Sequence, residues 1–137
     1  MANKPFLCLN MIVKNESKII RRLLDSTLPI IDAYCICDTG STDNTIEIIR
    51  QYFKEKGIPG EVFEIPFRDF GYNRTKALER AEKWGKYALL LDADMILELQ
   101  PSFKKSDIVL DVYQIKQKNS VLDYYNTRIV RTDKGIT

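Results

Sequence analysis

The sequence predicts an α/β fold of three layers, in which helices cover both faces of a mostly parallel central sheet. Short apolar segments alternate with segments whose apolar residues recur at helical spacing. The connections between successive apolar segments are long enough to hold a helix, as parallel strands require. A chain of 137 residues, 45% of them hydrophobic, can bury an ordinary core without disulfides. We therefore expect residues 1–137 to form a single domain.

The first thirty residues predict a strand, a turn and a helix. Residues 6–13 are a nearly continuous apolar run, which is typical of a strand covered on both faces. Asn15 follows as a candidate helix cap, and a helical pattern then continues until Pro29. The apolar residues of this pattern are Ile19, Ile20, Leu23 and Leu24.

The second unit repeats this order. Residues 33–37 are a short apolar strand that ends at Asp38. In the turn that follows, we expect Gly40 to permit a tight bend, and Asp43 with the neighbouring hydroxyls to cap a helix. That helix should end near Gly57 and bury Ile46, Ile49 and Phe53.

The remaining chain holds two more parallel strands and an edge. Residues 61–65 form a short strand, and residues 68–73 are expected to be a loop leading into a helix. Residues 87–91 are the most hydrophobic strand, so we expect them to lie centrally. Later, residues 108–116 and 124–131 predict two strands of an antiparallel edge. The expected inner face of the helix between residues 73 and 85 is Ala77, Leu78, Ala81 and Trp84.

Charge and composition exclude several classes of function. The net charge of +2 is too balanced for a dedicated nucleic-acid surface, and no apolar run is long enough to span a membrane. The three cysteines lie in apolar runs, so we expect buried thiols in a reducing, cytoplasmic setting. The chain has no histidine, so carboxylates must carry any metal or proton chemistry.

Carboxylates follow two of the predicted strands, at the points where those strands end. Asp38 follows one strand, and Asp92 and Asp94 follow another. Because ligands of open α/β sheets bind outside the carboxyl ends of the strands, we expect these side chains to share one crevice. Two carboxylates separated by one residue suit a hard divalent cation such as Mn²⁺ or Mg²⁺. The alternative, a turn residue and a cap, is disfavoured by the buried strand before them, because ionised groups at that depth need a partner.

Asp38 and Arg74 are further candidates for ligand contact. The need for a turn and a helix cap explains the glycine and the hydroxyls that follow Asp38. It does not explain the Asp38 carboxylate, which could accept an N–H group from a ligand ring. Arg74 stands near the start of a helix, where a guanidinium could hold a diphosphate or fix Asp38. A solvated surface arginine is an equally simple interpretation.

Four segments, in this order, resemble the motifs of the family 2 glycosyltransferases. The Asp-x-Asp triplet is common by itself, the Asp-Thr-Gly-Ser-Thr-Asp stretch is more specific, and the ordered set is more specific still. The resemblance covers nearly the entire chain, from about residue 6 to residue 131. It implies a GT-A fold, a divalent cation (Mn²⁺ or Mg²⁺) and a nucleotide-diphosphate sugar as donor, typically with uracil as its base. The four segments are Leu9–Glu16, Asp38–Thr45, Phe70–Ala77 and Leu89–Asp94.

The resemblance also assigns roles to individual residues. Asp38 would bind the base, Asp92 would approach the ribose and the metal, and Asp94 would bind the metal directly. Arg74 matches the arginine of the family's Arg-Asn-x-Ala segment, although here Thr75 stands in place of the asparagine. The implied nucleotide-binding residues are Ile12, Val13, Asn15, Glu16, Asp38, Gly40, Arg74, Asp92 and Ala93, and the implied metal ligands are Asp94 and Asp92.

The implied reaction is transfer of the sugar to an acceptor hydroxyl, with inversion at the anomeric carbon. The metal would neutralise the departing nucleoside diphosphate, and a general base would deprotonate the acceptor. In this family the base lies well downstream of the Asp-x-Asp, and no carboxylate after Asp94 is singled out by its spacing. We therefore expect the catalytic base to lie outside this chain, which would be the donor-binding part of a longer enzyme. The acceptor, whether glycan, protein or lipid, stays open.

Two other functions fit part of the pattern. Leu89–Asp94 also resembles the nucleophile strand of haloacid-dehalogenase-like phosphatases, with Asp92 as nucleophile and Asp94 as acid. That motif normally opens its domain, whereas here it stands late in the chain. A non-catalytic nucleotide-sugar-binding module is the second alternative, since it could keep the donor site and lack only the base.

Overall fold

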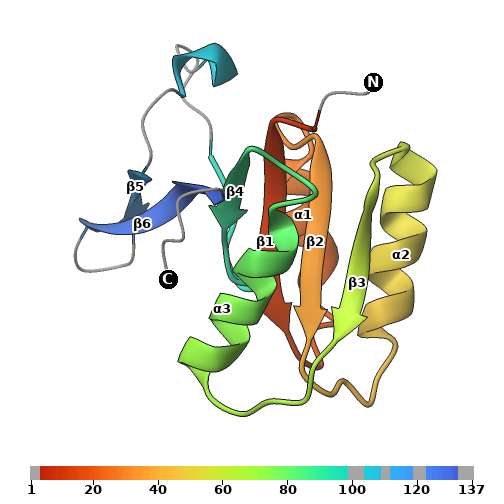
Figure 1. The fold of residues 1–137 in the computed structure, drawn as a ribbon. Coiled ribbons are helices and arrows are strands. Elements are labelled where there is room, and N and C mark those ends of the chain that lie inside the picture. Colours follow the sequence, from red (N-terminus) through yellow and green to blue (C-terminus); the bar gives the residue numbers. More distant parts are fainter. Residues whose placement is uncertain (1–3, 99–103, 109–111, 119–122, 133–137) are drawn as a thin grey trace.

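Six strands form one sheet in the part of the chain that the computed structural model describes, which is residues 4–98, 104–108, 112–118 and 123–132. Their order across the sheet is β3-β2-β1-β4-β6-β5 (Figure 1). The first four are parallel, and β6 pairs antiparallel with both β4 and β5. The antiparallel edge predicted from the sequence is therefore confirmed. The strands are β1 (Leu7–Val13), β2 (Ala33–Asp38), β3 (Gly60–Glu64), β4 (Tyr87–Leu90), β5 (Val112–Lys118) and β6 (Asp123–Arg131).

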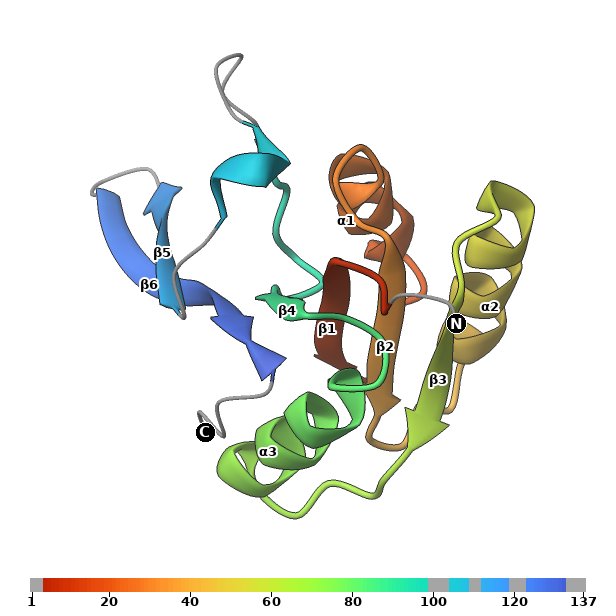
Figure 2. The same ribbon diagram turned by 45° about the horizontal axis from the view of Figure 1, so that its top comes forward.

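Helices cover both faces of the sheet, which confirms the predicted three layers. Helices α1 (Ile20–Thr27) and α2 (Thr45–Lys56) lie on one face, and α3 (Phe70–Ala81) lies on the other (Figure 2). A short 3₁₀ helix, η1 (Lys105–Asp107), precedes β5. No helix among the described residues is long and apolar enough to cross a membrane.

The core explains why the central strands are apolar throughout. All six residues of β2 are buried, and β4 lies between β1 and β6, as its hydrophobicity predicts. The three cysteines are buried, free thiols beneath α3. Burial raises the pKa of each thiol, that of Cys35 to about 12, which confirms the expectation of buried thiols.

The expected role of Asn15 as the cap of α1 was wrong. The helix begins at Ile20 and has no side-chain cap. Instead, the backbone carbonyl of Glu16 accepts hydrogen bonds from the N–H groups of Ile19 and Ile20 at 3.1 and 2.9 Å and closes the turn. The side chain of Asn15 is used elsewhere, in the loop that follows β2.

The start of α3 also differs from the prediction. The helix begins at Phe70, inside the segment expected to be a loop, because the Asp69 carboxylate accepts a hydrogen bond from the N–H of Tyr72 at 2.7 Å and caps it. The buried face includes the expected Ala77, while Trp84 lies beyond the helix end.

Smaller differences concern α2 and β5. In α2, Ile46 is only partly buried, and Ile48 and Tyr52 join Ile49 and Phe53 on the buried face. Strand β5 begins at Val112 rather than at residue 108, and residues 109–111 lie outside the described residues. None of these differences moves a predicted site residue.

Candidate functional site

The parallel strands end along one edge of the sheet (Figure 1). The predicted charged residues of the site follow these strand ends and lie close to one another. Strand β1 lies between β2 and β4, with Val13 paired to Asp38 and Asn10 paired to Leu90. The chain therefore leaves β2 and β4 on either side of β1. Since neighbouring strands are about 4.8 Å apart, the two exits lie roughly 10 Å from each other. A diphosphate with its base and sugar is long enough to reach across both.

The exit of β4 presents two carboxylates to solvent from a fixed turn. The N–H of Met95 donates to the carbonyl of Asp92 at 3.0 Å, and Ala93 between the two aspartates is buried. Asp94 is exposed, and the Arg22 guanidinium of α1 contacts its backbone carbonyl at 3.4 Å. The turn is thus held by its main chain while both acidic side chains stay accessible.

Arg74 reaches this turn from α3, on the other face of the sheet. Its guanidinium lies 3.6 Å from the Asp92 carboxylate, and the two side chains are 30% and 50% exposed. At that exposure the ion pair contributes little to stability. It leaves one basic and one acidic group side by side and open to a ligand.

Asn73, beside Arg74, is a buried residue that no motif in the sequence singled out. Its Oδ1 accepts the N–H of Arg68 at 2.9 Å, and its Nδ2 donates to the carbonyl of Pro66 at 3.3 Å. These bonds pin the loop before α3 and so fix the helical turn that carries Arg74. The available signal was spacing, because Asn73 precedes the buried Ala77 by four residues.

Asp38 is fully buried and shapes its own turn. Its Oδ1 accepts the N–H groups of Gly40 and Ser41 at 2.9 and 2.8 Å, and its Oδ2 accepts the Ser41 hydroxyl at 2.6 Å. Gly40 has a φ of 128°, a value that residues with a side chain rarely adopt. Oδ2 keeps one acceptor position, because a carboxylate oxygen has two lone pairs. A ligand N–H reaches it only if the covering side chains shift.

The end of β1 supplies the floor between these two exits. Val13 is buried, and its carbonyl accepts the backbone N–H of Thr39 at 3.0 Å. Ile12 is partly buried and packs against the cluster beneath α3. These two apolar residues could contact a ligand by packing, but they carry no charge. Asn15 and Glu16 follow them, at the start of the next loop.

Negative charge accumulates at this edge. Burial raises the pKa of Glu16, and the charges of Asp94, Asp43 and Asp92, in that order, raise it further. No group of three or more metal-ligating side chains occurs among the described residues. A cation attracted to these carboxylates would take its other ligands from water or from a phosphate-bearing substrate, as Mg²⁺ commonly does. Asp92 and Asp94 therefore fit a substrate-completed cation site.

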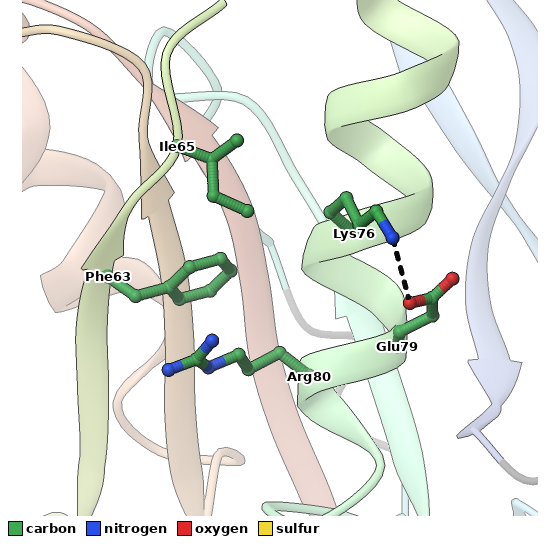
Figure 3. Close-up of a pocket in the computed structure, with 5 residues that line it drawn as sticks. All are labelled: Phe63, Ile65, Lys76, Glu79 and Arg80. Carbon is green, nitrogen blue, oxygen red and sulfur yellow. Dashed lines mark ion pairs between the residues drawn. The ribbon is translucent and has the colours of Figure 1, made fainter.

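A separate hollow lies between β3 and α3 (Figure 3). It has a volume of about 350 Å³, and Lys76 and Glu79 form an ion pair at its rim, 3.7 Å apart. None of the predicted site residues lines it, so it is distinct from the edge described above. Its lining residues are Phe63, Ile65, Lys76, Glu79 and Arg80.

Residues 8–105 match the protein family described as Glycosyl transferase family 2. The SPbeta prophage-derived glycosyltransferase SunS of Bacillus subtilis (strain 168) is 29% identical over 116 residues, which are 83% of this chain and 26% of that protein. Glycosyltransferase SunS of Bacillus phage SPbeta matches equally. The chain thus spans about a quarter of the length of these curated relatives.

Solved structures share the fold. S. aureus TarS 1-349 in complex with UDP superposes with a TM-score of 0.55 and 25% identity, over 65% of this chain and 27% of that one. The mannosyltransferase PcManGT from Pyrobaculum calidifontis, in complex with GDP-Man and Mn²⁺, gives a TM-score of 0.59 at 20% identity, over 72% and 30% of the two chains. The second likeness shows the fold alone. Together with the observed sheet order, these matches confirm the predicted GT-A fold.

Proposed function

Because this chain belongs to glycosyl transferase family 2, we propose that it is the donor-binding part of a glycosyltransferase that takes a nucleotide-diphosphate sugar. The observation that carries the proposal is the pair Asp92 and Asp94, which leave β4 into solvent beside Arg74, at the edge where β2 also ends. The similarity to TarS, which was solved with UDP, supports uracil as the base. The reaction would be inverting transfer to an acceptor hydroxyl, with the acceptor and the catalytic base supplied from outside these residues.

The site divides into a phosphate end and a base end. At the phosphate end, Asp94 and Asp92 would hold Mn²⁺ or Mg²⁺, which neutralises charge on the leaving diphosphate when bound. Arg74 would hold the diphosphate or orient Asp92. At the base end, Asp38 would accept an N–H group of the base through its remaining acceptor position once the side chains that cover it shift, with Gly40 letting the backbone approach closely. The end of β1, through Ile12 and Val13, would lie beneath the nucleotide.

The proposal can be tested because the effect of the Asp94 charge on diphosphate binding should change sign when a divalent cation is added. Without a divalent cation, Asp94 repels a diphosphate. With the cation, the same carboxylate recruits it. At about 5 Å in water, one such repulsion amounts to roughly 0.8 kcal/mol, or about fourfold in affinity. Asp94→Asn keeps the shape of the side chain and removes its charge.

Calorimetric titration of UDP should therefore show opposite effects of Asp94→Asn on affinity in chelator and in Mn²⁺. In chelator, Asp94→Asn should bind UDP up to about fourfold more tightly than the unaltered chain. In Mn²⁺, it should bind at least tenfold more weakly, because a metal ligand is lost. Glu82→Ala, which removes an exposed carboxylate on the turn after α3, is the matched control and should change neither value. Equal UDP affinity of Asp94→Asn and the unaltered chain in Mn²⁺ would remove Asp94 from the site.

The two alternatives differ from this proposal in measurable ways. A non-catalytic binding module would bind the donor but neither hydrolyse nor transfer it, on this chain or on a longer product that contains it. A phosphatase using Asp92 would form a phosphoaspartate. The family match favours glycosyl transfer over that chemistry.

A further inference from the structure

The loop after β1 and the loop after β2 are joined by side-chain hydrogen bonds. Three successive backbone N–H groups of the first loop donate to three side chains, two in the second loop and one on Thr45, the first residue of α2, so hydrogen bonds tie the two loops together. Such bonds satisfy donors that would otherwise face water, and they tie segments that are far apart in the chain. The pairs are Asn15 N to Ser41 Oγ at 2.8 Å, Glu16 N to Thr45 Oγ1 at 2.9 Å, and Ser17 N to Asp43 Oδ2 at 3.4 Å.

Asn15 also accepts bonds in the opposite direction. Its side-chain Oδ1 receives the N–H groups of Thr42 at 2.7 Å and Asp43 at 3.3 Å. Its φ of 54° is the only positive value of a non-glycine residue in the described ranges. Asparagine is among the few residues that tolerate this left-handed conformation. Backbone and side chain therefore both call for this residue type.

The same residue is connected to Asp38 through one hydroxyl. The N–H of Asn15 donates to Ser41 Oγ, and that hydroxyl donates to Asp38 Oδ2 at 2.6 Å. Oδ2 is the oxygen that keeps an acceptor position for a ligand. We infer that Asn15 is a positioning residue, which holds the turn after β2 and thereby aims Asp38 at the base of the nucleotide. This inference rests on the proposed function and replaces direct nucleotide contact as the role of the Asn15 side chain.

Two substitutions separate the side-chain bonds from the backbone conformation. Asn15→Gly accepts the positive φ but loses the acceptor, whereas Asn15→Asp tolerates the same φ and keeps it. Alanine would add backbone strain and confuse the comparison. Calorimetric titrations of UDP and ADP in Mn²⁺ supply the readout. Because both ligands carry the same diphosphate, the ratio of their affinities cancels the extra charge of the aspartate.

We expect Asn15→Gly to weaken UDP binding about tenfold and to bring the UDP-to-ADP ratio close to one. Asn15→Asp should keep the ratio of the unaltered chain. If Asn15→Gly only loosened the loop, it would weaken the binding of UDP and ADP alike. The UDP-to-ADP affinity ratio would then equal that of the unaltered chain, which would overturn the inference. Loss of the ratio in Asn15→Asp as well would also overturn it.

A ligand-free measurement keeps this test apart from that of the proposed function. Amide hydrogen exchange at Thr42 and Asp43 should accelerate in Asn15→Gly and stay slow in Asn15→Asp, and unchanged exchange in Asn15→Gly would overturn the inference directly. If the unaltered chain bound neither nucleotide, or bound both equally, the proposed donor and base recognition would fail instead, whatever the exchange rates.

Discussion

Removing the side chain of Asn73 tests whether the loop before α3 is held from beneath. Asn73→Ala deletes the acceptor of the Arg68 N–H, 2.9 Å away, and the donor to the Pro66 carbonyl, 3.3 Å away. A part-buried N–H left without its partner costs about 1.5 kcal/mol, and the longer bond adds about 1 kcal/mol. Alanine returns about 0.5 kcal/mol through its higher helix propensity. The expected loss in the free energy of unfolding is therefore about 2 kcal/mol.

Urea denaturation followed by circular dichroism measures this loss, because the midpoint shifts while the slope stays constant if only stability changes. Asn44→Ala is the matched control. Both asparagines lie near the start of a helix: Asn44 directly precedes α2, and Asn73 lies in the first turns of α3. The side chain of Asn44 makes no capping hydrogen bond. The control should stay within about 0.5 kcal/mol of the unaltered chain. If the two variants lost equal stability, or if Asn73→Ala lost under about 0.5 kcal/mol, the loop would not depend on Asn73.

Three further predictions follow from packing and titration. Gly85→Ala would place a Cβ 2.7 Å from the Cβ of Cys8, so the melting temperature should fall by the equivalent of about 1–3 kcal/mol, and an unchanged melting temperature would show that the site can relax. The hydrogen bond from the Thr45 side chain lowers the pKa of Asp43 to about 2, so the stability that this carboxylate contributes is complete above its unfolded value of 3.8 and is lost as pH falls through about 2. An NMR titration of Asp43 with a midpoint near 3.8 would contradict this. Burial raises the pKa of Cys35 to about 12, so a thiol reagent at pH 8 should label the native chain far more slowly than the urea-denatured chain, and equal rates would refute its burial.

The architecture could be predicted because it rests on patterns that are local in the sequence. The apolar run before Val13 and the helical spacing after Asn44 each follow from what a segment must bury. The strand exits then place Asp38 and Asp92 at one edge, since parallel strands end on the same side. This step needs only strand direction and order.

The hydrogen bonds behind the site could not be predicted in the same way. The role expected for Asn15 was a helix cap or nucleotide contact, because its partners in residues 41–43 are more than twenty-five residues away. Asn73 was predicted to lie in a loop. It lies in α3 instead, because the cap at Asp69 starts the helix earlier than expected. The Asp38 carboxylate likewise accepts a hydrogen bond from the hydroxyl of Ser41, which was expected to help cap a helix. In each case a polar side chain has several local uses, and only the folded chain selects one.

The arrangement of charge and rigidity explains why these hidden bonds matter to the proposed site. Asp94, Asp43 and Asp92 repel the charge of Glu16 across the open edge, and the Arg74 guanidinium pairs with Asp92. Like charges left to themselves would spread apart, because exposed side chains relax at little cost. Here the loops that carry them are tied by main-chain and side-chain hydrogen bonds, so in the proposed site the charges would stay close enough to attract a divalent cation before a diphosphate arrives. A bound cation would then make this edge attract a diphosphate that the carboxylates alone would repel.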